Sequence, residues 1–368
     1  MSSGISLATP LLLSEDPEKI VREFDQAGKS EEIALFLYPE GWPDSNHWLV
    51  SSKGSIRLVL GHSRLRWPLT FEEAVRKVAE AQLLMRRAAV FAQAVRRLAR
   101  EREISEDEAL LYWVCWEHGY DWPNQVPDGV EWRRMLQLLE ERGREHFQRG
   151  LEVLPLIPEN SIQAPPGVSA WILSPPSVMG VRWGAIPQWD SLPDTTRIEE
   201  WLSVPIEKIV QALGMVASQK GRATLVITDN QEYVTKLIFR WDGEVSIQKN
   251  KRGSSESLPT RSLGKGQRFY ILKRIADEKT ALRRAVVRAV AFRHLVEGRD
   301  LQEAAHLIAL AEYGFAKLDD VPPASRFLIQ DAADQHRAII QTGMRVLEIL
   351  ERSPSGGGHG TVHEDQAG

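Results

Sequence analysis

Apolar positions along the chain follow two different periods, and each period predicts a different kind of element. After residue 70, apolar side chains return every three or four positions, placing Phe91, Val95 and Leu98 on one face. Arginines occupy the opposite face, so the pattern predicts an amphipathic helix over residues 70–103. Similar helical patterns cover residues 16–27, 105–118, 130–149, 203–218, 277–297, 300–313 and 324–352.

Several of these helices have recognisable starts. Thr70 is followed three residues later by Glu73, and Ser105 is followed at the same distance by Glu108. This spacing is typical of a capping box, in which each side chain binds the other residue's backbone N–H. Ser203 is the expected N-cap of a further helix, because a serine hydroxyl can accept a hydrogen bond from the first turn.

A strand pattern dominates the middle of the chain. The runs 223–228, 233–240 and 244–248 alternate apolar and polar residues, and the turn formers Asp242 and Gly243 separate the last two. Three such runs predict an antiparallel meander with one buried and one wet face. Further strand candidates cover residues 33–38, 47–60, 168–173 and 178–186.

Together these patterns predict an α+β fold with a mixed helical and strand N-terminal unit, a small antiparallel β-meander and an α-helical C-terminal unit. The expected domains are a mixed, mostly helical N-terminal domain (1–150), a strand-rich α+β domain (151–248), a basic flexible linker (249–270), a helical C-terminal domain (271–352) and a disordered tail (353–368).

Composition narrows the class of protein. Cys115 is the single cysteine, so the chain can form no intramolecular disulfide, and we expect it to act as a small buried hydrophobe. No apolar stretch approaches the roughly 20 residues that a membrane-spanning helix needs. We therefore expect a cytoplasmic protein with no membrane partner.

Charge is distributed unevenly behind a net charge of −4. Residues 249–299 contain fourteen Lys or Arg and four Asp or Glu, whereas residues 300–368 contain five and eleven. Local charge determines electrostatic partners more directly than the sum does. The basic segment is therefore the main functional candidate.

Familiar catalytic and cofactor motifs do not select a site. The sequence has no Walker A loop, no dinucleotide-binding glycine pattern and no nucleophile elbow, and one cysteine excludes a thiolate zinc site within one chain. Glu303 and His306 have the spacing of half a di-iron site, but no second such pair exists. We expect no cofactor and no metal.

The candidate site is a set of cations around the predicted linker. Its members are Lys249, Lys251, Arg252, Arg261, Lys265, Arg268, Lys273, Arg274, Arg284 and Arg288. A mobile basic loop beside a basic helix suits contact with the phosphates of nucleic acid. A partner protein is also possible. The alternative without a binding function is that these cations form a solvated surface, or pair internally with the acidic C-terminal helices.

These observations favour a non-catalytic binding or accessory factor that contacts nucleic acid or a partner protein through residues 249–288. Trp183 and Trp189 are the tryptophans best placed for a surface role, since they bracket a short non-helical segment. The alternative is an enzyme whose site is assembled from residues distant in sequence, because catalytic groups need not be close along the chain.

Overall fold

The computed structural model describes most of the chain. It covers residues 15–39, 47–60, 66–158, 161–166, 192–229, 233–252, 261–263, 267–295 and 299–352, with the single residues Leu13, Trp42, Val168, Val181 and Trp183. The predicted tail at 353–368 lies outside the described residues. The strand candidates at 168–173 and 178–186 also lie outside them, apart from Val168, Val181 and Trp183. These three residues are not in strands.

The protein has an α+β fold with two sheets and many helices, as the sequence predicts. The chain forms two compact units, and each is assembled from three separated stretches. Unit 1 comprises residues 1–123, 135–177 and 287–341; unit 2 comprises residues 124–134, 178–286 and 342–368. The domains predicted from the sequence are consecutive, and these compact units interleave along the chain.

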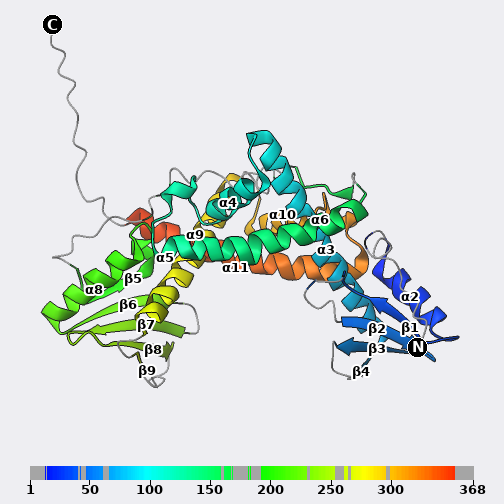
Figure 1. Cartoon of the computed structure of the whole chain (residues 1–368), viewed down its shortest axis with the longest axis horizontal. Helices are drawn as coiled ribbons and strands as arrows, with labels where there is room; N and C mark the ends of the chain where they lie inside the picture. Colours follow the sequence, from blue (N-terminus) through cyan, green and yellow to red (C-terminus); the bar gives the residue numbers. More distant parts are fainter. Residues whose placement is uncertain are drawn as a thin grey trace, which may run out of the picture. The chain divides into compact units, whose positions relative to one another are not determined.

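Unit 1 contains a four-stranded antiparallel sheet in the order β1-β2-β3-β4. Its strands are β1 (Ile33–Phe36), β2 (His47–Ser52), β3 (Ser55–Leu60) and β4 (Arg66–Leu69). Lys53 and Gly54 form the tight turn between β2 and β3, both with positive φ. Helix α2 (Pro17–Ala27) and the long helix α3 lie against this sheet (Figure 1). Their apolar faces join those of the strands in one core.

The helices of unit 1 pack around α3 (Phe71–Arg102). The others are α4 (Glu106–Glu117), α6 (Glu145–Val153) and α10 (Leu301–Glu312), while α5 (Val130–Leu138), α9 (Arg268–Leu295) and α11 (Arg326–Arg352) each contribute residues to both units. A π-helical stretch (Leu139–Arg144) connects α5 to α6. Short 3-10 turns occur at Pro123–Gln125, Leu154–Leu156, Ile198–Trp201, Leu318–Asp320 and Pro323–Ser325.

Both predicted capping boxes are confirmed. Thr70 and Glu73 bind each other's backbone N–H at the start of α3, and Ser105 and Glu108 do the same at the start of α4. Close approach of α6 to α3 depends on Gly150, because a Cβ there would collide with the carbonyl oxygen of Ala88.

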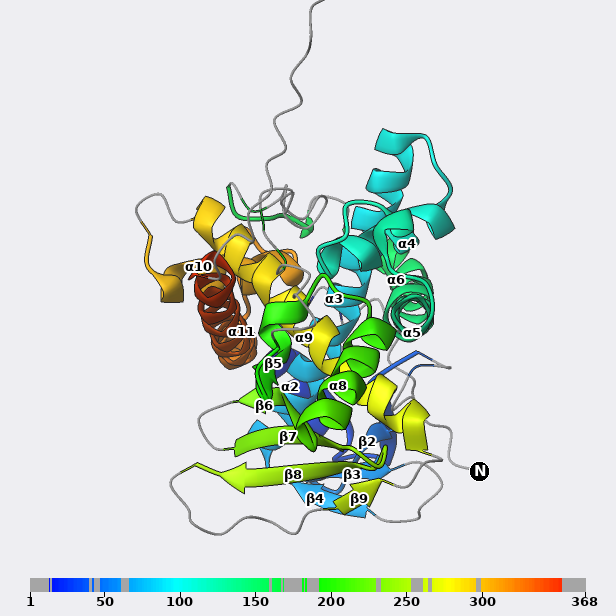
Figure 2. The same cartoon turned by 90° about the vertical axis from the view of Figure 1, so that its left-hand side faces the viewer.

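Unit 2 contains a five-stranded mixed sheet in the order β5-β6-β7-β8-β9. Its strands are β5 (Thr195–Arg197), β6 (Arg222–Asp229), β7 (Tyr233–Arg240), β8 (Val245–Lys251) and β9 (Arg261–Leu263). The predicted meander is confirmed as β6 to β8, and β5 adds a parallel edge strand that the sequence did not suggest. Helix α8 (Ile206–Lys220) packs along β6 and β7 (Figure 2).

The start of α8 differs from the sequence prediction. Its N-cap is Pro205 rather than Ser203, and no side chain at that position caps the helix. Instead, the backbone N–H of Ile206 donates to Oε1 of Glu131 at 3.1 Å. Reciprocally, the N–H of Val130 donates to Oε1 of Glu207 at 3.1 Å. The N-termini of α5 and α8 thus cap one another.

The segment predicted as a linker is partly regular. Strand β8 extends through Lys251, β9 covers Arg261–Leu263, and α9 already begins at Arg268. The structure also describes Arg252 and Gln267 of the predicted linker. The rest of the linker before α9, residues 253–260 and 264–266, lies outside the described residues. None of the helices in the described residues combines the length and apolar character needed to cross a lipid bilayer.

Candidate functional site

Strand register brings two of the predicted cations onto one face of the unit 2 sheet. Lys249 is paired with Thr235, and Lys251 is paired with Tyr233. Directly opposed residues of antiparallel strands project from the same face. Both lysines are exposed, and Tyr233 is 36% exposed. We call these three residues, with the exposed Arg252 that follows β8, the basic face.

The basic face continues from the hydrophobic core of unit 2. Along the same strand faces, Leu237 lies opposite Ile247 and Phe239 lies opposite Val245, and Leu237 and Phe239 are buried. Alternation along β8 therefore passes from Val245 and Ile247 to the two lysines on one side of the strand. One sheet face is apolar at one end and cationic at the other.

Helix α9 crosses this sheet on the same face. Thr228 of β6 is paired with Thr235, and its hydroxyl donates to Oε2 of Glu278 on α9 at 2.8 Å. Burial raises the pKa of Glu278 above its usual value, while the Thr228 hydrogen bond and Arg274 oppose the shift.

The first turns of α9 combine cations with exposed aromatic rings. Lys273 is exposed and Arg274 is half-buried, while Phe269 and Tyr270 are 66% and 49% exposed. Tyr233, Phe269 and Tyr270 are not among the site residues predicted from the sequence. Their exposure depends on where the packing of neighbouring elements ends, which local sequence does not specify.

The remaining predicted cations are placed less completely. The backbone of Arg261 lies in β9 opposite Ile247, and Arg284 is half-buried on α9. The side chains of Arg261 and Arg268, and the whole of Lys265, lie outside the described residues.

Arg288 does not belong to a surface site. Its side chain is 5% exposed and lies 3.7 Å from Oε1 of Glu117 and 3.6 Å from Oε1 of Glu312. Glu312 is on α10. Arg288 is therefore an internal partner for the acidic C-terminal helices, which is the alternative to a functional surface. Arg288 shares a helix face with Arg284, but that spacing does not indicate whether the Arg288 side chain is buried.

Two further cations of α9 serve the interior of unit 2. Lys279 Nζ donates to Oε1 of Glu131 at 2.8 Å and to the carbonyl of Val204 at 2.5 Å. Arg283 donates to the carbonyl of Leu202 at 3.0 Å, and its guanidinium carbon lies 3.9 Å from the ring centre of Trp183. Trp183, a predicted surface candidate, is thus half-buried against a cation, and Trp189 lies outside the described residues.

Unit 1 contains a partly buried charge network centred on Glu312. His336 Nε2 lies 3.1 Å from Oε2 of this carboxylate, and Arg87 lies 3.5 Å from the same oxygen. Burial alone would raise the pKa of Glu312, yet Arg87, His336 and Arg288 hold it well below its usual range. Burial lowers the pKa of His336. These charged side chains are therefore paired with one another and do not form an open site.

The other sequence candidates have ordinary surroundings. Glu303 pairs with Arg299 at 3.6 Å, and His306 Nε2 contacts Oε1 of Gln330 at 2.7 Å. Within the described ranges, no cluster of His, Cys, Asp or Glu side chains is arranged to hold a metal ion. Cys115 is buried as predicted, and burial raises the pKa of its thiol to about 12.

A comparison of the chain with protein-family models, with curated proteins and with solved structures gives no match. The interpretation of function therefore depends on the geometry of the site.

Proposed function

We propose that the protein is a non-catalytic factor that binds nucleic acid through the basic face of unit 2. The observation that carries this proposal is the pairing of β7 with β8, which aligns the exposed side chains of Lys249, Lys251 and Tyr233 at one end of a sheet face. A basic groove or face with an aromatic ring is the combination that binds a sugar-phosphate chain.

The two residue types contribute in different ways. Lysine ammonium groups neutralise phosphates and release condensed counterions, so binding weakens as salt is added. An exposed tyrosine ring offers a flat surface on which a base can stack, with little preference for sequence. Arg252 extends the charge beyond the end of β8, and the exposed Lys273 adds to it from α9.

Binding is favoured over catalysis by where the perturbed titratable groups lie. Glu312, His336 and Lys279 are engaged in buried ion pairs or hydrogen bonds, and Glu278 accepts the hydroxyl hydrogen bond of Thr228. An acid–base site needs such a group within reach of a substrate. The cations of the basic face, by contrast, are open to solvent.

The test replaces Lys249, Lys251 and Arg252 together by glutamine in the full chain. Binding of a fluorescein-labelled single strand and a labelled duplex of mixed sequence is followed by anisotropy at about 50 mM and about 200 mM salt. The substituted protein should bind more weakly, and the slope of log K against log salt should fall by at most about 2.7, since each lost phosphate contact is worth about 0.9 on a duplex.

A matched control keeps the same change in charge. Lys29, Lys53 and Arg57 are exposed cations of unit 1, and their replacement by glutamine should leave binding unchanged. Equal binding by the basic-face variant and the control would contradict the proposal. If the natural sequence binds neither oligonucleotide but the basic-face variant loses a co-purifying protein, the partner-protein hypothesis replaces it.

A further inference from the structure

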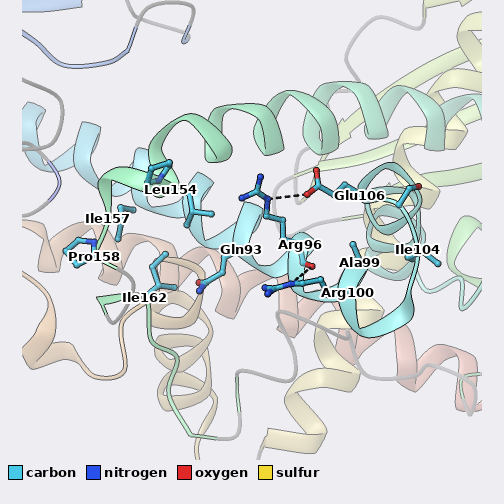
Figure 3. Close-up of a pocket in the computed structure, with 12 residues that line it drawn as sticks. Gln93, Arg96, Ala99, Arg100, Ile104, Glu106, Leu154, Ile157, Pro158 and Ile162 are labelled. Carbon is cyan, nitrogen blue, oxygen red and sulfur yellow. Dashed lines mark hydrogen bonds and ion pairs between the residues drawn. The ribbon is translucent and has the colours of Figure 1, made fainter.

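Unit 1 contains an open hollow of about 1050 Å³ that is separate from the basic face. One side is the C-terminal part of α3, another is the start of α4, and a third is residues 154–158 with Ile162 (Figure 3). We call it the α3–α4 hollow. Its volume lies at the upper limit of pockets that hold small organic ligands, about 1000 Å³.

The α3 side of the hollow carries polar groups. Gln93, Arg96 and Arg100 are three and four residues apart, a spacing that places them along one side of a helix. The Nε of Arg96 lies 3.2 Å from Oε1 of Glu106, which ties this guanidinium to the start of α4. The Nε of Arg100 donates to the backbone carbonyl of Arg96 at 3.3 Å. Both arginines are thereby oriented.

The charge of the hollow is positive. Its charged lining residues are Arg96, Arg100 and Glu106, which makes two cations and one anion. Within the described residues, no carboxylate forms an ion pair with Arg100.

The opposite end of the hollow is apolar. Leu154, Ile157, Pro158 and Ile162 lie together at one end in Figure 3, and Arg100 lies toward the other. Gln93 and Arg96 lie between the two groups. The hollow therefore has an apolar end and an opposite end where Arg100 lies near Glu106, Ala99 and Ile104, with Gln93 and Arg96 between the two ends.

We propose that the α3–α4 hollow binds an amphiphilic carboxylate, a small molecule with an apolar chain that ends in a carboxylate group. The carboxylate pairs with Arg100 and Arg96, because planar guanidinium groups match its geometry and charge. The chain lies against Leu154, Ile157 and Ile162, where its burial removes apolar surface from water. This assignment uses only unit 1 and is independent of the proposed nucleic-acid surface.

The test titrates the full chain with decanoate by isothermal calorimetry, alongside decanol and decyltrimethylammonium as neutral and cationic comparators. Decanoate should bind saturably at one site, and both comparators should bind at least about tenfold more weakly, the equivalent of one charged hydrogen bond. In a series of shorter carboxylates, affinity should rise about fourfold with each buried methylene.

Single substitutions locate the carboxylate. Arg100→Gln should weaken decanoate by about tenfold and leave decanol unchanged. Arg97→Gln is the matched control, since Arg97 is an exposed neighbour on α3 that pairs with Glu101 at 2.7 Å and does not line the hollow. Three results would each overturn the proposal: no saturable decanoate binding, equal affinity for decanol, or acetate binding as tightly as decanoate.

Discussion

Glu131 and Lys279 form a buried ion pair that connects two distant parts of unit 2. The Nζ–Oε1 distance is 2.8 Å, and the two side chains are 6% and 2% exposed. The same oxygen of Glu131 accepts the backbone N–H of Ile206, so one carboxylate caps α8 and neutralises a lysine of α9. Burial lowers the pKa of Lys279, and Glu131 opposes that shift.

Breaking this pair should be costly. Glu131→Gln leaves a buried ammonium group without a counter-charge, and we expect the free energy of unfolding to fall by about 3 kcal/mol. Lys279→Met should cost a similar amount. The double variant should lose clearly less than the sum of the two, because it leaves no isolated charge. Urea denaturation of the four proteins measures this coupling, and additive losses would show that the pair is not energetically coupled.

The reciprocal caps of α5 and α8 require a glycine at position 129. Gly129 has φ of +93°, and a Cβ at this position would lie 2.6 Å from Oε1 of Glu207. Gly129→Ala should therefore displace the carboxylate that caps Val130, in addition to straining the backbone. We expect a loss of stability of about 2 kcal/mol, combining backbone strain and a lost cap.

Gly243→Ala separates these two effects. Gly243 is also in unit 2 and has φ of +79°, but an added Cβ there has no atom within 4 Å. Its replacement should cost only the backbone strain, about 1 kcal/mol. If the two alanine variants unfold at the same urea concentration, displacement of Glu207 contributes nothing.

Arg288 should behave as a structural residue and not as a binding residue. Arg288→Met removes a buried partner of Glu117 and Glu312, and we expect it to lower the free energy of unfolding by about 3 kcal/mol. Below the unfolding transition, its affinity for the labelled oligonucleotides should equal that of the natural sequence. Normal stability combined with weakened binding would instead place Arg288 in the nucleic-acid interface.

Stability should fall on acidification, through the half-buried His146 and the buried His336 of unit 1. Burial, reinforced by Arg87 and Arg149, lowers the pKa of His146 from 6.5 to about 4. Between these values the unfolded chain holds a proton that the folded protein does not. The free energy of unfolding therefore drops as pH falls below 6.5, by about 1.4 kcal/mol per pH unit for this one group.

The variant His146→Phe isolates this effect. His146 packs against Phe91 with ring centres 5.1 Å apart, so a second aromatic ring retains the contact. Urea midpoints measured from pH 7 to pH 5 should decline less steeply in the variant than in the natural sequence. His336, whose pKa is also lowered, supplies part of the decline that remains. If the urea midpoints of the two proteins decline equally with pH, His146 does not contribute to the pH dependence of stability.

Features with a short-range cause could be predicted from the sequence. The capping boxes at Thr70 and Ser105 need only residues three positions apart, and both are observed. The start of α8 has a long-range cause, because its N–H partner Glu131 is 75 residues away along the chain. A serine near Ile206 was the best local candidate, and tertiary structure supplied a different acceptor.

The candidate site also combines features that local sequence predicts with features that depend on distant residues. Alternation along Val245, Ile247, Lys249 and Lys251 was readable in the sequence and places the two lysines on one side of β8. Whether a cation of α9 is exposed was not readable, since Lys273 lies in solvent and Lys279 is buried one to two turns later. That difference depends on which neighbouring elements cover the helix.

The interleaving of the two units has a consequence for how the protein is made. Unit 1 needs residues up to 341, and unit 2 needs residues from 342 onward. Chains with consecutive domains can complete the first domain while the ribosome is still translating the second. Here the first 123 residues must wait, incompletely packed, for helices synthesised much later. Neither unit can be complete before residues 287–352 have been synthesised, and we expect the nascent chain to depend on chaperones for longer than a chain of consecutive domains would.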